Sequence, residues 1–254
     1  MEPVRNHRSQ VVVDASRLHR ARERRDTGLT LLEGPHLLDE AVKAGADIRT
    51  VFVATGDTAG ETAASSIGIE PVVVDDRALQ RIAGTETPRG PVAVVAIPQQ
   101  SPPVAQHLLV SWGVSDPGNI GTMIRVAAAV GWDFSYTAGT ADPWSPKVLR
   151  AGAGSQFSVR ITEVGGLDEI RSAGYTPLAS VVSGGIDPEL LESRRWALLI
   201  GEEASGLPDD VVTASDRSTS IPMPGGFESL NAAVAAGILA YVISKHSGEG
   251  GEQV

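Results

Sequence analysis

The chain has 254 residues and a formal net charge of −10, with 42% hydrophobic and 20% charged residues. This balance is that of an ordinary globular protein, and the length accommodates one large or two modest domains. The absence of cysteine excludes disulfides, thiolate catalysis and zinc–thiolate sites. No apolar run reaches the roughly 18 residues of a transmembrane helix, and the N-terminus lacks the apolar core of a signal peptide. We therefore expect a cytoplasmic protein without membrane contact.

Five histidines are scattered along the chain, and none forms an HxH or HExxH pair that could hold a metal ion. They are His7, His19, His36, His107 and His246. Each is explained as a surface or capping residue, so the sequence predicts no metal site.

The basic residues are concentrated near the N-terminus. Between Arg5 and Arg25, seven arginines stand against Asp14 and Glu23, which gives this stretch a charge of +5 and leaves −15 for the rest. An arginine-rich arm on an acidic body suits a nucleic-acid backbone, because the planar guanidinium group matches phosphate. A solvated helix face explains the same residues. The candidate phosphate contacts are Arg17, Arg20, Arg24 and Arg25.

The first hundred residues alternate between apolar strands and amphipathic helices. A helix capped by Asp14 or Ser16 is expected to run to about Asp26, before the break at Thr27 and Gly28. Strands are predicted at 29–34, 48–55, 70–75 and 90–97, and helices at 35–45, 57–68 and 76–84. This order predicts an αβα layered domain over residues 1–100.

The second half resumes the alternation after a proline-rich stretch. Three prolines within 97–106 predict a linker, which we place at 101–106, and the second domain at 107–246. Its strands are predicted at 107–114 and near 133–138, 157–162, 175–182, 196–201 and 217–222, with helices at 120–131 and 229–246. The pattern is typical of an α/β domain with a parallel sheet. Residues 247–254 have nothing to bury and are expected to be disordered.

Three polar segments stand at predicted strand–loop–helix junctions of the second domain, where open α/β sheets bind ligands. They are SDPGNIGTMIR (115–125), IGEEASG (200–206) and IPMPGGFESLN (221–231). None contains the GxxxxGK[ST] pattern of a P-loop. Arg125 follows Asn119 by six residues, so both are expected to face one cleft.

Each segment also has a simpler structural explanation. The DPGN sequence at 116–119 is a strong turn, and the arginine after it is then a surface residue. Glu202 or Glu203 could cap the next element, and Ser229 is a natural N-cap with Asn231 in the first turn of its helix. Taken singly, the three segments leave the choice between structure and function open.

Their order and spacing together are more specific. The chain resembles the SpoU (TrmH-type) RNA ribose 2′-O-methyltransferases of the SPOUT class over most of residues 107–245. The resemblance rests on VSDPGNIGTMIRVAAAVG (114–131), SPKVLRAGAG (145–154), LLIGEEASGL (198–207) and IPMPGGFESLNAAVAAGILAY (221–241). The stretch LLEGPHLLDEAVKAGADIRTVFV (31–53) is similar to the L30e-like RNA-binding domain that many members carry.

The resemblance implies an α/β protein in which an N-terminal L30e-like αβα domain precedes a SPOUT domain. That domain would have a parallel sheet with a deep trefoil knot, form homodimers, and bind S-adenosylmethionine. The cofactor would be held by main-chain groups around Gly201, Ile221 and Leu230. The matching catalytic positions are Asn119, Arg125, Glu203, Ser229 and Asn231.

The reaction implied is methyl transfer to a ribose 2′-hydroxyl. We expect Arg125 to grip the RNA phosphate and to stabilise charge developing on the 2′-oxygen, because arginine is a poor proton acceptor. Glu203 is expected to orient Arg125. Asn119, Ser229 and Asn231 are expected to fix the knot loops and the ribose.

The expected substrate is a structured RNA, and 23S ribosomal RNA is favoured because dedicated tRNA members of the family typically lack the L30e-like domain. The alternatives are a tRNA 2′-O-methyltransferase and a non-catalytic ribosome-assembly protein that keeps the knot and binds RNA. Two departures from the family's pattern mildly favour the last: Glu202 stands where an uncharged residue is common, and Gly152 where serine is common. A dinucleotide-dependent oxidoreductase has its best support in Gly152-x-Gly154, which lacks a third glycine.

Overall fold

The structure is a computed structural model that describes residues 5–226 and 229–248. It divides into two compact units, residues 1–99 with 144–157 and residues 100–143 with 158–254. Among the described residues, no helix is long and apolar enough to cross a membrane.

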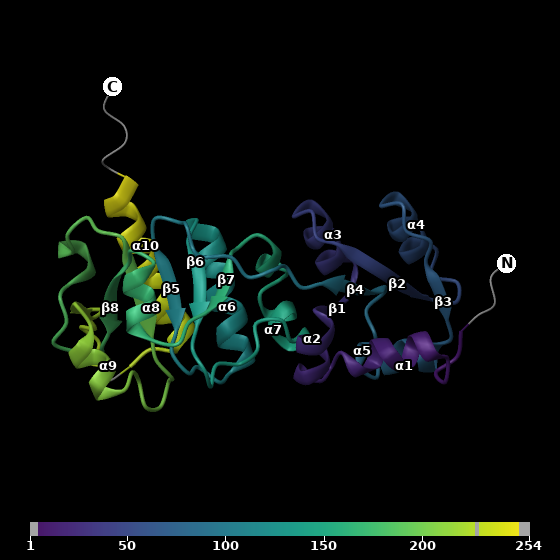
Figure 1. Cartoon of the computed structure of the whole chain (residues 1–254), viewed down its shortest axis with the longest axis horizontal. Coiled ribbons are helices and arrows are strands. Elements are labelled where there is room, and N and C mark those ends of the chain that lie inside the picture. Colours follow the sequence, from purple (N-terminus) through teal and green to yellow (C-terminus); the bar gives the residue numbers. More distant parts are fainter. Residues whose placement is uncertain (1–4, 227–228, 249–254) are drawn as a thin grey trace, which may run out of the picture. The chain divides into compact units, whose positions relative to one another are not determined.

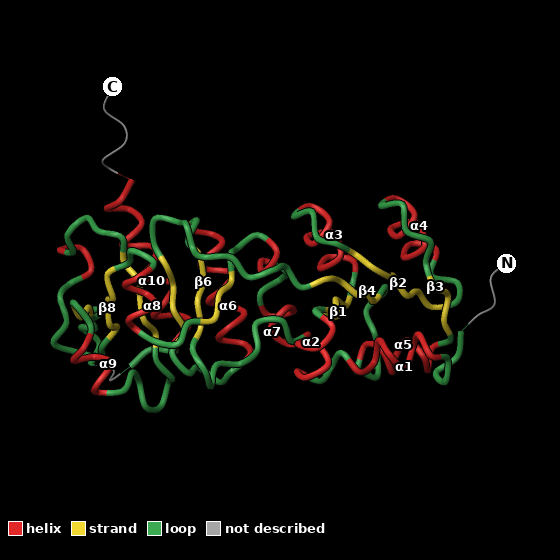
Figure 2. The backbone as a smooth tube through the Cα atoms, viewed as in Figure 1, coloured by secondary structure: helices red, strands yellow, loops and turns green. Residues whose placement is uncertain are grey.

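In the first unit, a four-stranded sheet lies between helices, as the αβα prediction requires (Figures 1 and 2). The elements in chain order are α1 (Gln10–Arg17), α2 (Ala21–Thr27), β1 (Leu29–Glu33), α3 (Pro35–Lys43), β2 (Ile48–Ala54), α4 (Thr58–Ser66), β3 (Val72–Val74), α5 (Asp76–Ala83) and β4 (Val92–Ala96). The strand order is β1-β4-β2-β3, with β4 antiparallel to β1 and β2, and β3 parallel to β2. α1 and α5 cover one face, where Val12, Phe52 and Ile82 are fully buried, and α3 and α4 cover the other (Figure 1).

The N-terminal helix is broken in two, which corrects the single helix expected. Asp14 and Ser16 lie inside α1 and do not cap it. Arg24 of α2 is only 3% exposed, and its guanidinium donates to the carbonyl of Leu18 at 2.7 Å, at the corner between the two helices. Arg24 therefore has a structural role, and the prediction that it contacts RNA is wrong because its side chain is enclosed.

Residues 144–157 pack with the first unit, although we expected them in the second domain. This segment holds α7 (Pro146–Ala151) and the 3-10 turn η1 (Ser155–Phe157). Thr30 Oγ1 donates to the carbonyl of Trp144 at 2.6 Å, and Arg150 forms an ion pair with Glu33 at 3.1 Å. The segment thus pairs with residues more than a hundred positions earlier, which local periodicity does not report.

The second unit contains a six-stranded sheet in which every neighbouring pair is parallel. Its elements are β5 (Leu108–Ser111), α6 (Pro117–Val130), β6 (Asp133–Tyr136), β7 (Ile161–Glu163), α8 (Leu167–Ser172), β8 (Thr176–Ser180), the 3-10 turn η2 (Pro188–Leu190), β9 (Trp196–Ile200), α9 (Asp209–Ala214), β10 (Arg217–Thr219) and α10 (Ala232–Gly248). The strand order is β10-β8-β9-β5-β6-β7. α8 and α9 pack on one face, and α6 and α10 pack together on the other (Figure 1). Because all strands point the same way, their carboxyl ends share one edge, where the three polar segments meet.

The last helix runs further than expected. α10 includes Ser247 and Gly248, which we had assigned to a disordered tail. The remainder of that tail, 249–254, lies outside the described residues.

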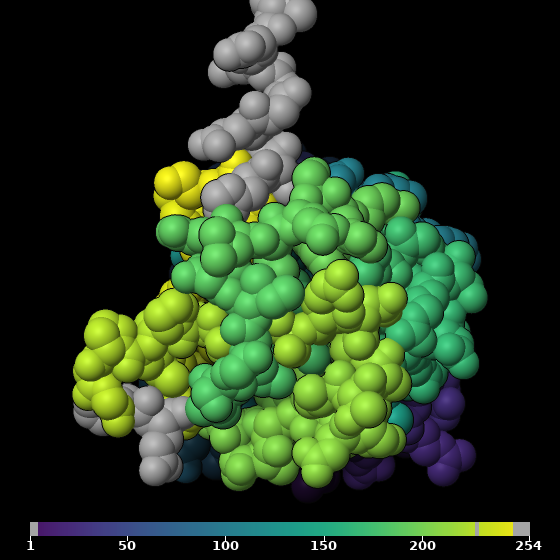
Figure 3. All heavy atoms as spheres, turned by 90° about the vertical axis from the view of Figure 1, so that its left-hand side faces the viewer, coloured from purple at the N-terminus to yellow at the C-terminus, as the bar shows by residue number. Residues whose placement is uncertain are grey.

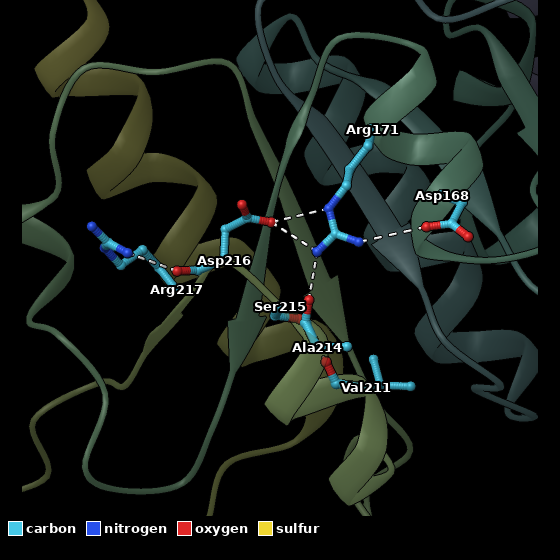
Figure 4. A network of polar contacts seen from close by, with 7 residues as sticks. All are labelled: Asp168, Arg171, Val211, Ala214, Ser215, Asp216 and Arg217. Atoms are coloured by element: carbon cyan, nitrogen blue, oxygen red, sulfur yellow. Dashed lines mark hydrogen bonds and ion pairs between the residues drawn. The ribbon is translucent and has the colours of Figure 1, made fainter.

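A polar network fastens the short edge strand β10 (Figure 4). Arg171 of α8 donates to Asp216 through Nε at 3.3 Å and Nη2 at 3.0 Å, and Nη2 also donates to the carbonyl of Ala214 at 2.5 Å. Its Nη1 lies 3.7 Å from Asp168. β10 has a strand on one side only, so these contacts help to position the chain that continues from it to Met223.

At the amino ends of the strands, a second set of polar side chains fastens the predicted linker. Asp133 accepts hydrogen bonds from the main-chain N–H groups of Val104 and Ala105 at 2.6 and 2.9 Å. The carbonyl of Ala105 accepts from Tyr175 at 2.8 Å and from Arg195 at 3.0 Å. We refer to these side chains and one histidine as the amino-end cluster: His107, Asp133, Tyr175 and Arg195.

Candidate active site

A cavity of about 860 Å³ opens at the carboxyl ends of β8, β9 and β10. Its walls are the loops 180–184, 200–206 and 220–223 and the segment 229–239, which includes the first turns of α10. Figure 3 shows the second unit from this side, where green and yellow-green segments of the chain are neighbours. The cavity has the size of a site for a cofactor-sized molecule.

The loop after β9 folds tightly over Gly201. A Cβ atom at this position would lie 2.2 Å from the carbonyl carbon of Gly206 and 2.3 Å from the nitrogen of Leu207. The N–H of Gly206 donates to the carbonyl of Glu202 at 2.8 Å, which closes the turn. No residue other than glycine fits at position 201, and its main chain forms part of the cavity wall.

The loop after β8 is a wall that the sequence analysis missed. A Cβ at Gly185 would lie 2.4 Å from the carbonyl carbon of Thr219, so this loop runs directly against the end of β10. The N–H of Ile186 donates to the carbonyl of Ser218 at 2.8 Å. The signal available was SGG at 183–185, a glycine-rich loop directly after a predicted strand.

The three predicted cofactor contacts come together here. Gly201, Ile221 and Leu230 all line the cavity, as do the predicted catalytic residues Glu203 and Ser229. Apolar residues, including Met223 and Leu239, line the cavity together with the glycine- and serine-containing loops. Apolar walls with convergent main-chain polar groups fit S-adenosylmethionine, which has a flat purine and a polar amino-acid end.

A hydrogen-bonded network joins all three polar segments beside the cavity. Asn119 Nδ2 donates to Glu203 Oε1 at 3.1 Å, and Asn231 Nδ2 donates to Asn119 Oδ1 at 2.9 Å. Asn231 Nδ2 also donates to Glu203 Oε1. We call Asn119, Glu203 and Asn231 the carboxyl-end network. Its members come from α6, the loop after β9 and the start of α10.

The start of α10 differs from the prediction. The helix begins at Ala232, and Asn231 Oδ1 accepts from the N–H groups of Ala233 and Val234 at 3.0 and 3.2 Å. Asn231 is therefore the N-cap, and Ser229 lies before the helix as an exposed residue on the cavity wall. One asparagine thus caps α10 with its oxygen and bonds the network with its nitrogen.

Arg125 lies apart from the network. Asn119 is 7% exposed, whereas Arg125 is exposed on α6 and lines no part of the cavity. Within the described chain, no hydrogen bond or ion pair holds Arg125, and the carboxylate of Glu203 is engaged by the two asparagines. The expectation that Glu203 orients Arg125 is therefore corrected. Asn119 and Arg125 are six residues apart on α6, which rotates one side chain from the other by about 240° beyond one full turn. Glu203 bonds Asn119, so Arg125 points away from it.

The remaining candidates fall elsewhere. Gly152 is the C-cap of α7, so the pair Gly152-x-Gly154 follows a helix instead of a strand, and the dinucleotide-binding alternative loses its support. Arg17, Arg20 and Arg25 are exposed, and Arg17 pairs with Asp14 at 3.2 Å. In residues 5–226 and 229–248, no three His, Cys, Asp or Glu side chains are grouped as a metal site would require.

Comparison with known families decides the class of the protein. Residues 106–241 match the SpoU rRNA Methylase family, and residues 10–93 match the MRM3-like substrate binding domain. The chain belongs to the SpoU rRNA methylase family. It is therefore an S-adenosylmethionine-dependent RNA methyltransferase, as the sequence resemblance implied.

Relatives of this SpoU protein match it almost end to end. It is 32% identical over 246 residues to the 23S rRNA (guanosine(2553)-2′-O)-methyltransferase RlmP of Bacillus subtilis (strain 168), covering 95% of this chain and 98% of that protein. The SpoU methyltransferase AviRb from Streptomyces viridochromogenes, solved with AdoMet, has a TM-score of 0.84 at 27% identity and covers 94% and 98% of the two chains. The AdoMet-bound rRNA methyltransferase from Sinorhizobium meliloti has a TM-score of 0.81 at 25% identity, covering 96% and 98%.

Proposed function

We propose that this SpoU protein methylates a ribose 2′-hydroxyl of 23S ribosomal RNA. The observation that carries the proposal is the carboxyl-end network, which ties Asn119, Glu203 and Asn231 together at the edge of a cofactor-sized cavity. A protein that had lost catalysis would have no reason to keep these three polar side chains linked beside the cavity. The network therefore speaks against the non-catalytic alternative.

In this proposal, the walls of the cavity hold the cofactor. Gly201, Ile221 and Leu230 contribute close main-chain approach and apolar contact. When bound, S-adenosylmethionine supplies a sulfonium methyl group that a nucleophilic oxygen can attack. The protein's contribution is to place that oxygen in line, a positioning effect worth roughly 7–11 kcal/mol in favourable cases.

Arg125 acts on the RNA and not on the cofactor. Its guanidinium is exposed, does not line the cavity, and is held by no other described residue, so it is available to bind a phosphate in a bidentate manner. From there it stabilises charge that develops on the 2′-oxygen. Ser229 lies exposed on the cavity wall, where its hydroxyl can contact the ribose. Glu203 fixes Asn119 and Asn231, and through them the start of α6 and of α10.

The favoured substrate is ribosomal because the match extends through the N-terminal unit. The MRM3-like substrate binding domain accounts for residues 10–93, and the relative RlmP, named for 23S rRNA, covers both units of this chain. Arg17, Arg20 and Arg25 are exposed cations of that unit and remain the proposed RNA contacts. The proposed location is the cytoplasm, where ribosomal RNA is processed in bacteria.

We also propose a homodimer that forms through the α6–α10 face of the second unit. Val234, Ile238 and Tyr241 are 49%, 38% and 58% exposed and follow one another at helical spacing on α10. Gly237 allows α10 to approach α6, since a Cβ there would lie 3.6 Å from Val126 Cγ2. An exposed apolar stripe on a helix that packs against α6 fits a subunit interface. Replacement of Tyr241 by lysine should convert the dimer to a monomer in sedimentation equilibrium.

The trefoil knot remains part of the proposal for the second unit. A close main-chain approach between two separate segments supports it: the loop after β8 runs against the end of β10 at Gly185. Tight glycine contacts of this kind are required where one segment is drawn past another.

The test of the function uses the full chain with tritiated S-adenosylmethionine and purified 23S rRNA or tRNA. Incorporation into 23S rRNA is expected, and primer extension at low dNTP concentration should stop at one 2′-O-methylated nucleotide. Label on base atoms alone would overturn the reaction type. Label in tRNA but not in 23S rRNA would support the tRNA alternative.

The proposed RNA contacts are tested by charge. The double variant Arg20→Glu/Arg25→Glu should weaken RNA binding, and its affinity should depend less steeply on salt, because fewer counterions are released. Arg22 is exposed and pairs with Asp26 at 3.4 Å, so Arg22→Glu serves as a single-site control in the same helix. Unchanged RNA affinity in the double variant would support the alternative that these arginines form a solvated helix face without a role in RNA binding.

A further inference from the structure

The charged side chains on the cavity wall are both acidic. Glu202 and Glu203 line it, whereas no lysine, arginine or histidine of the described chain does. The second unit as a whole contains seven Lys and Arg against seventeen Asp and Glu. A cleft lined by one sign of charge in a body of the same sign favours a ligand of the opposite charge.

Glu202 is the carboxylate that the network leaves unused. Glu203 accepts from Asn119 and Asn231, whereas Glu202 Oε1 accepts from the hydroxyl of Ser115 at 2.7 Å. The main-chain carbonyl of Glu202 also accepts from Gly206 at 2.8 Å. The turn fixes the main chain of Glu202 and the serine fixes its carboxylate, so this half-buried residue has a defined position in the lining of the cavity.

We propose that Glu202 is a specificity-determining residue that makes the cavity prefer S-adenosylmethionine to the demethylated product, S-adenosylhomocysteine. The inference rests on the proposed function. In the reaction, the bond between sulfur and the methyl carbon breaks with its electron pair staying on sulfur. A bond between the methyl carbon and the ribose oxygen forms, and the hydroxyl proton is released to solvent. The bound cofactor thereby loses one positive charge, and the wall carboxylate loses its attraction for it.

The helix end beside the cavity acts on both ligands alike. The amino end of α10 carries a partial positive charge, which attracts the amino-acid carboxylate that the cofactor and the product share. Asn231 already bonds the N–H groups of Ala233 and Val234, which reduces this effect further. Discrimination between the two ligands therefore falls to the wall carboxylates, which respond to the sulfonium charge, and Glu202 is the one of the two that the carboxyl-end network does not engage.

The expected size of the effect is modest because Glu202 is partly exposed. A unit charge at this depth interacts through an effective dielectric between those of protein and water, so the preference should change by about three- to tenfold. Salt near 1 M shortens the Debye length to about 3 Å and should remove most of that difference. The expected benefit of the carboxylate at Glu202 is that the neutral product leaves the cavity faster than the cationic cofactor does.

The experiment measures the dissociation constants of both ligands for the full-length protein by isothermal titration calorimetry. In Glu202→Gln, the ratio of the product's constant to the cofactor's should fall about three- to tenfold at low salt. Ser115→Ala keeps the charge and removes its hydrogen bond, so it should change the ratio less. Glu163→Gln makes the same chemical change at an exposed residue of β7 outside the cavity and should leave the ratio unchanged.

The outcomes separate this inference from the function on which it rests. If both ligands bind and Glu202→Gln weakens or strengthens them equally, Glu202 acts through the shape of its loop and the inference is overturned. An equal change of the ratio in Ser115→Ala or Glu163→Gln would overturn it too. If neither ligand binds the unaltered protein, the proposed function itself fails.

Discussion

The two ends of the second unit's parallel sheet both carry polar side chains, but they use them differently. At the amino ends, Asp133, Tyr175 and Arg195 bond mainly to the main chain of the linker, at Val104 and Ala105. At the carboxyl ends, Asn119, Glu203 and Asn231 bond to one another. The first arrangement gives partners to main-chain groups of the linker and fastens it to the sheet. The second fixes the positions of three side chains relative to one another beside an open cavity.

This difference separates structural from functional polar groups. A side chain whose partner is the main chain has its role accounted for by folding, since buried N–H and C=O groups need partners. Ordering side chains from segments far apart in sequence so that they bond one another costs conformational entropy. When such side chains lie at a cavity, we attribute to them a role in binding or catalysis. The comparison predicts that changes at the carboxyl ends alter binding or turnover, and that changes at the amino ends alter stability.

The largest effect is expected at Arg125, which stands outside both sets. Arg125→Ala should reduce kcat by roughly 10²–10³-fold, since it removes a charged donor from the developing oxyanion. The affinity for S-adenosylmethionine should stay within about twofold, because the side chain does not line the cavity. Single-turnover kinetics and calorimetry measure the two quantities separately.

Arg125→Lys and Arg160→Ala control this result. Substantial activity in Arg125→Lys would show that a point charge suffices and that the guanidinium fork is not needed. Arg160 is an exposed arginine of the same unit that donates to Ser101 at 3.1 Å, so Arg160→Ala should retain turnover. Loss of cofactor affinity in Arg125→Ala equal to its loss of turnover would contradict its assignment to the RNA.

The next largest effect is expected from Gly201→Ala. The added methyl group would lie 2.2 Å from the carbonyl carbon of Gly206, so the loop after β9 must move. We expect at least about a hundredfold loss of cofactor affinity, because the displaced main chain forms part of the cavity wall. Gly166→Ala provides the control, since a Cβ at Gly166 meets no atom within 4 Å. Calorimetry that shows equal cofactor binding by the two variants would argue against this loop as the cofactor site.

A smaller effect is expected from Glu203→Ala, which leaves the Nδ2 groups of Asn119 and Asn231 without their carboxylate acceptor. Asn231 keeps its bond to Asn119 Oδ1, but the Nδ2 group of the buried Asn119 loses its acceptor, which costs about 1–3 kcal/mol. The loop after β9 is then held less firmly at the cavity, and cofactor affinity should fall about tenfold. The double variant Asn119→Ala/Glu203→Ala should lose less than the sum of the single losses, because both changes break one network. Strictly additive losses in a double-mutant cycle would show that the network is not coupled.

How far these sites could be predicted depends on sequence distance. The strands and helices followed from periodicity to within a few residues, and Gly201, Ile221 and Leu230 all reached the cavity. The hydrogen-bond partners of Glu203 could not be predicted from the sequence, because Asn119 lies 84 residues away and no local pattern reports such a pairing. Residues 144–157 lie within the SpoU family match but pack with the first unit, and this packing could not be predicted for the same reason: their partners in β1 stand far away in the chain.

The two errors at individual arginines have local causes. Arg24 was expected on the surface because one continuous helix would expose it, whereas the break after Leu18 turns the chain and encloses its side chain. Arg125 was expected to face Asn119 because it follows that residue by six positions, less than two helical turns. α6 begins at Pro117 and contains both residues. Their side chains therefore follow the rotation of the helix and point to different sides.

The smallest effect on activity, and the sharpest test of the amino-end cluster, is expected at His107. Burial, reinforced by the charge of Arg195, lowers the pKa of His107 from 6.5 to about 4. Its Nδ1 accepts a hydrogen bond from the N–H of Trp196 at 3.2 Å, and its ring packs on Trp132 with centroids 4.9 Å apart. The folded protein therefore holds the ring neutral, with Nδ1 unprotonated.

The sign of the pH dependence follows from that pKa. The unfolded chain takes up the proton near pH 6.5, whereas the folded protein resists it down to about pH 4, so the stabilisation is complete above pH 6.5 and is lost as the pH falls between these values. The loss amounts to about 3 kcal/mol.

His107→Asn keeps an acceptor near Nδ1 but does not titrate, so the unfolding free energy of this variant, measured with urea, should depend less steeply on pH across the same interval. At pH 8 its kcat and cofactor affinity should match those of the unaltered protein, since His107 lies before β5, at the opposite end of the strand from the edge where the cavity opens. If the unfolding free energy of the variant depended on pH as steeply as that of the unaltered protein, or if its turnover at pH 8 were impaired, the assignment of stability to the amino ends and of activity to the carboxyl ends would be contradicted.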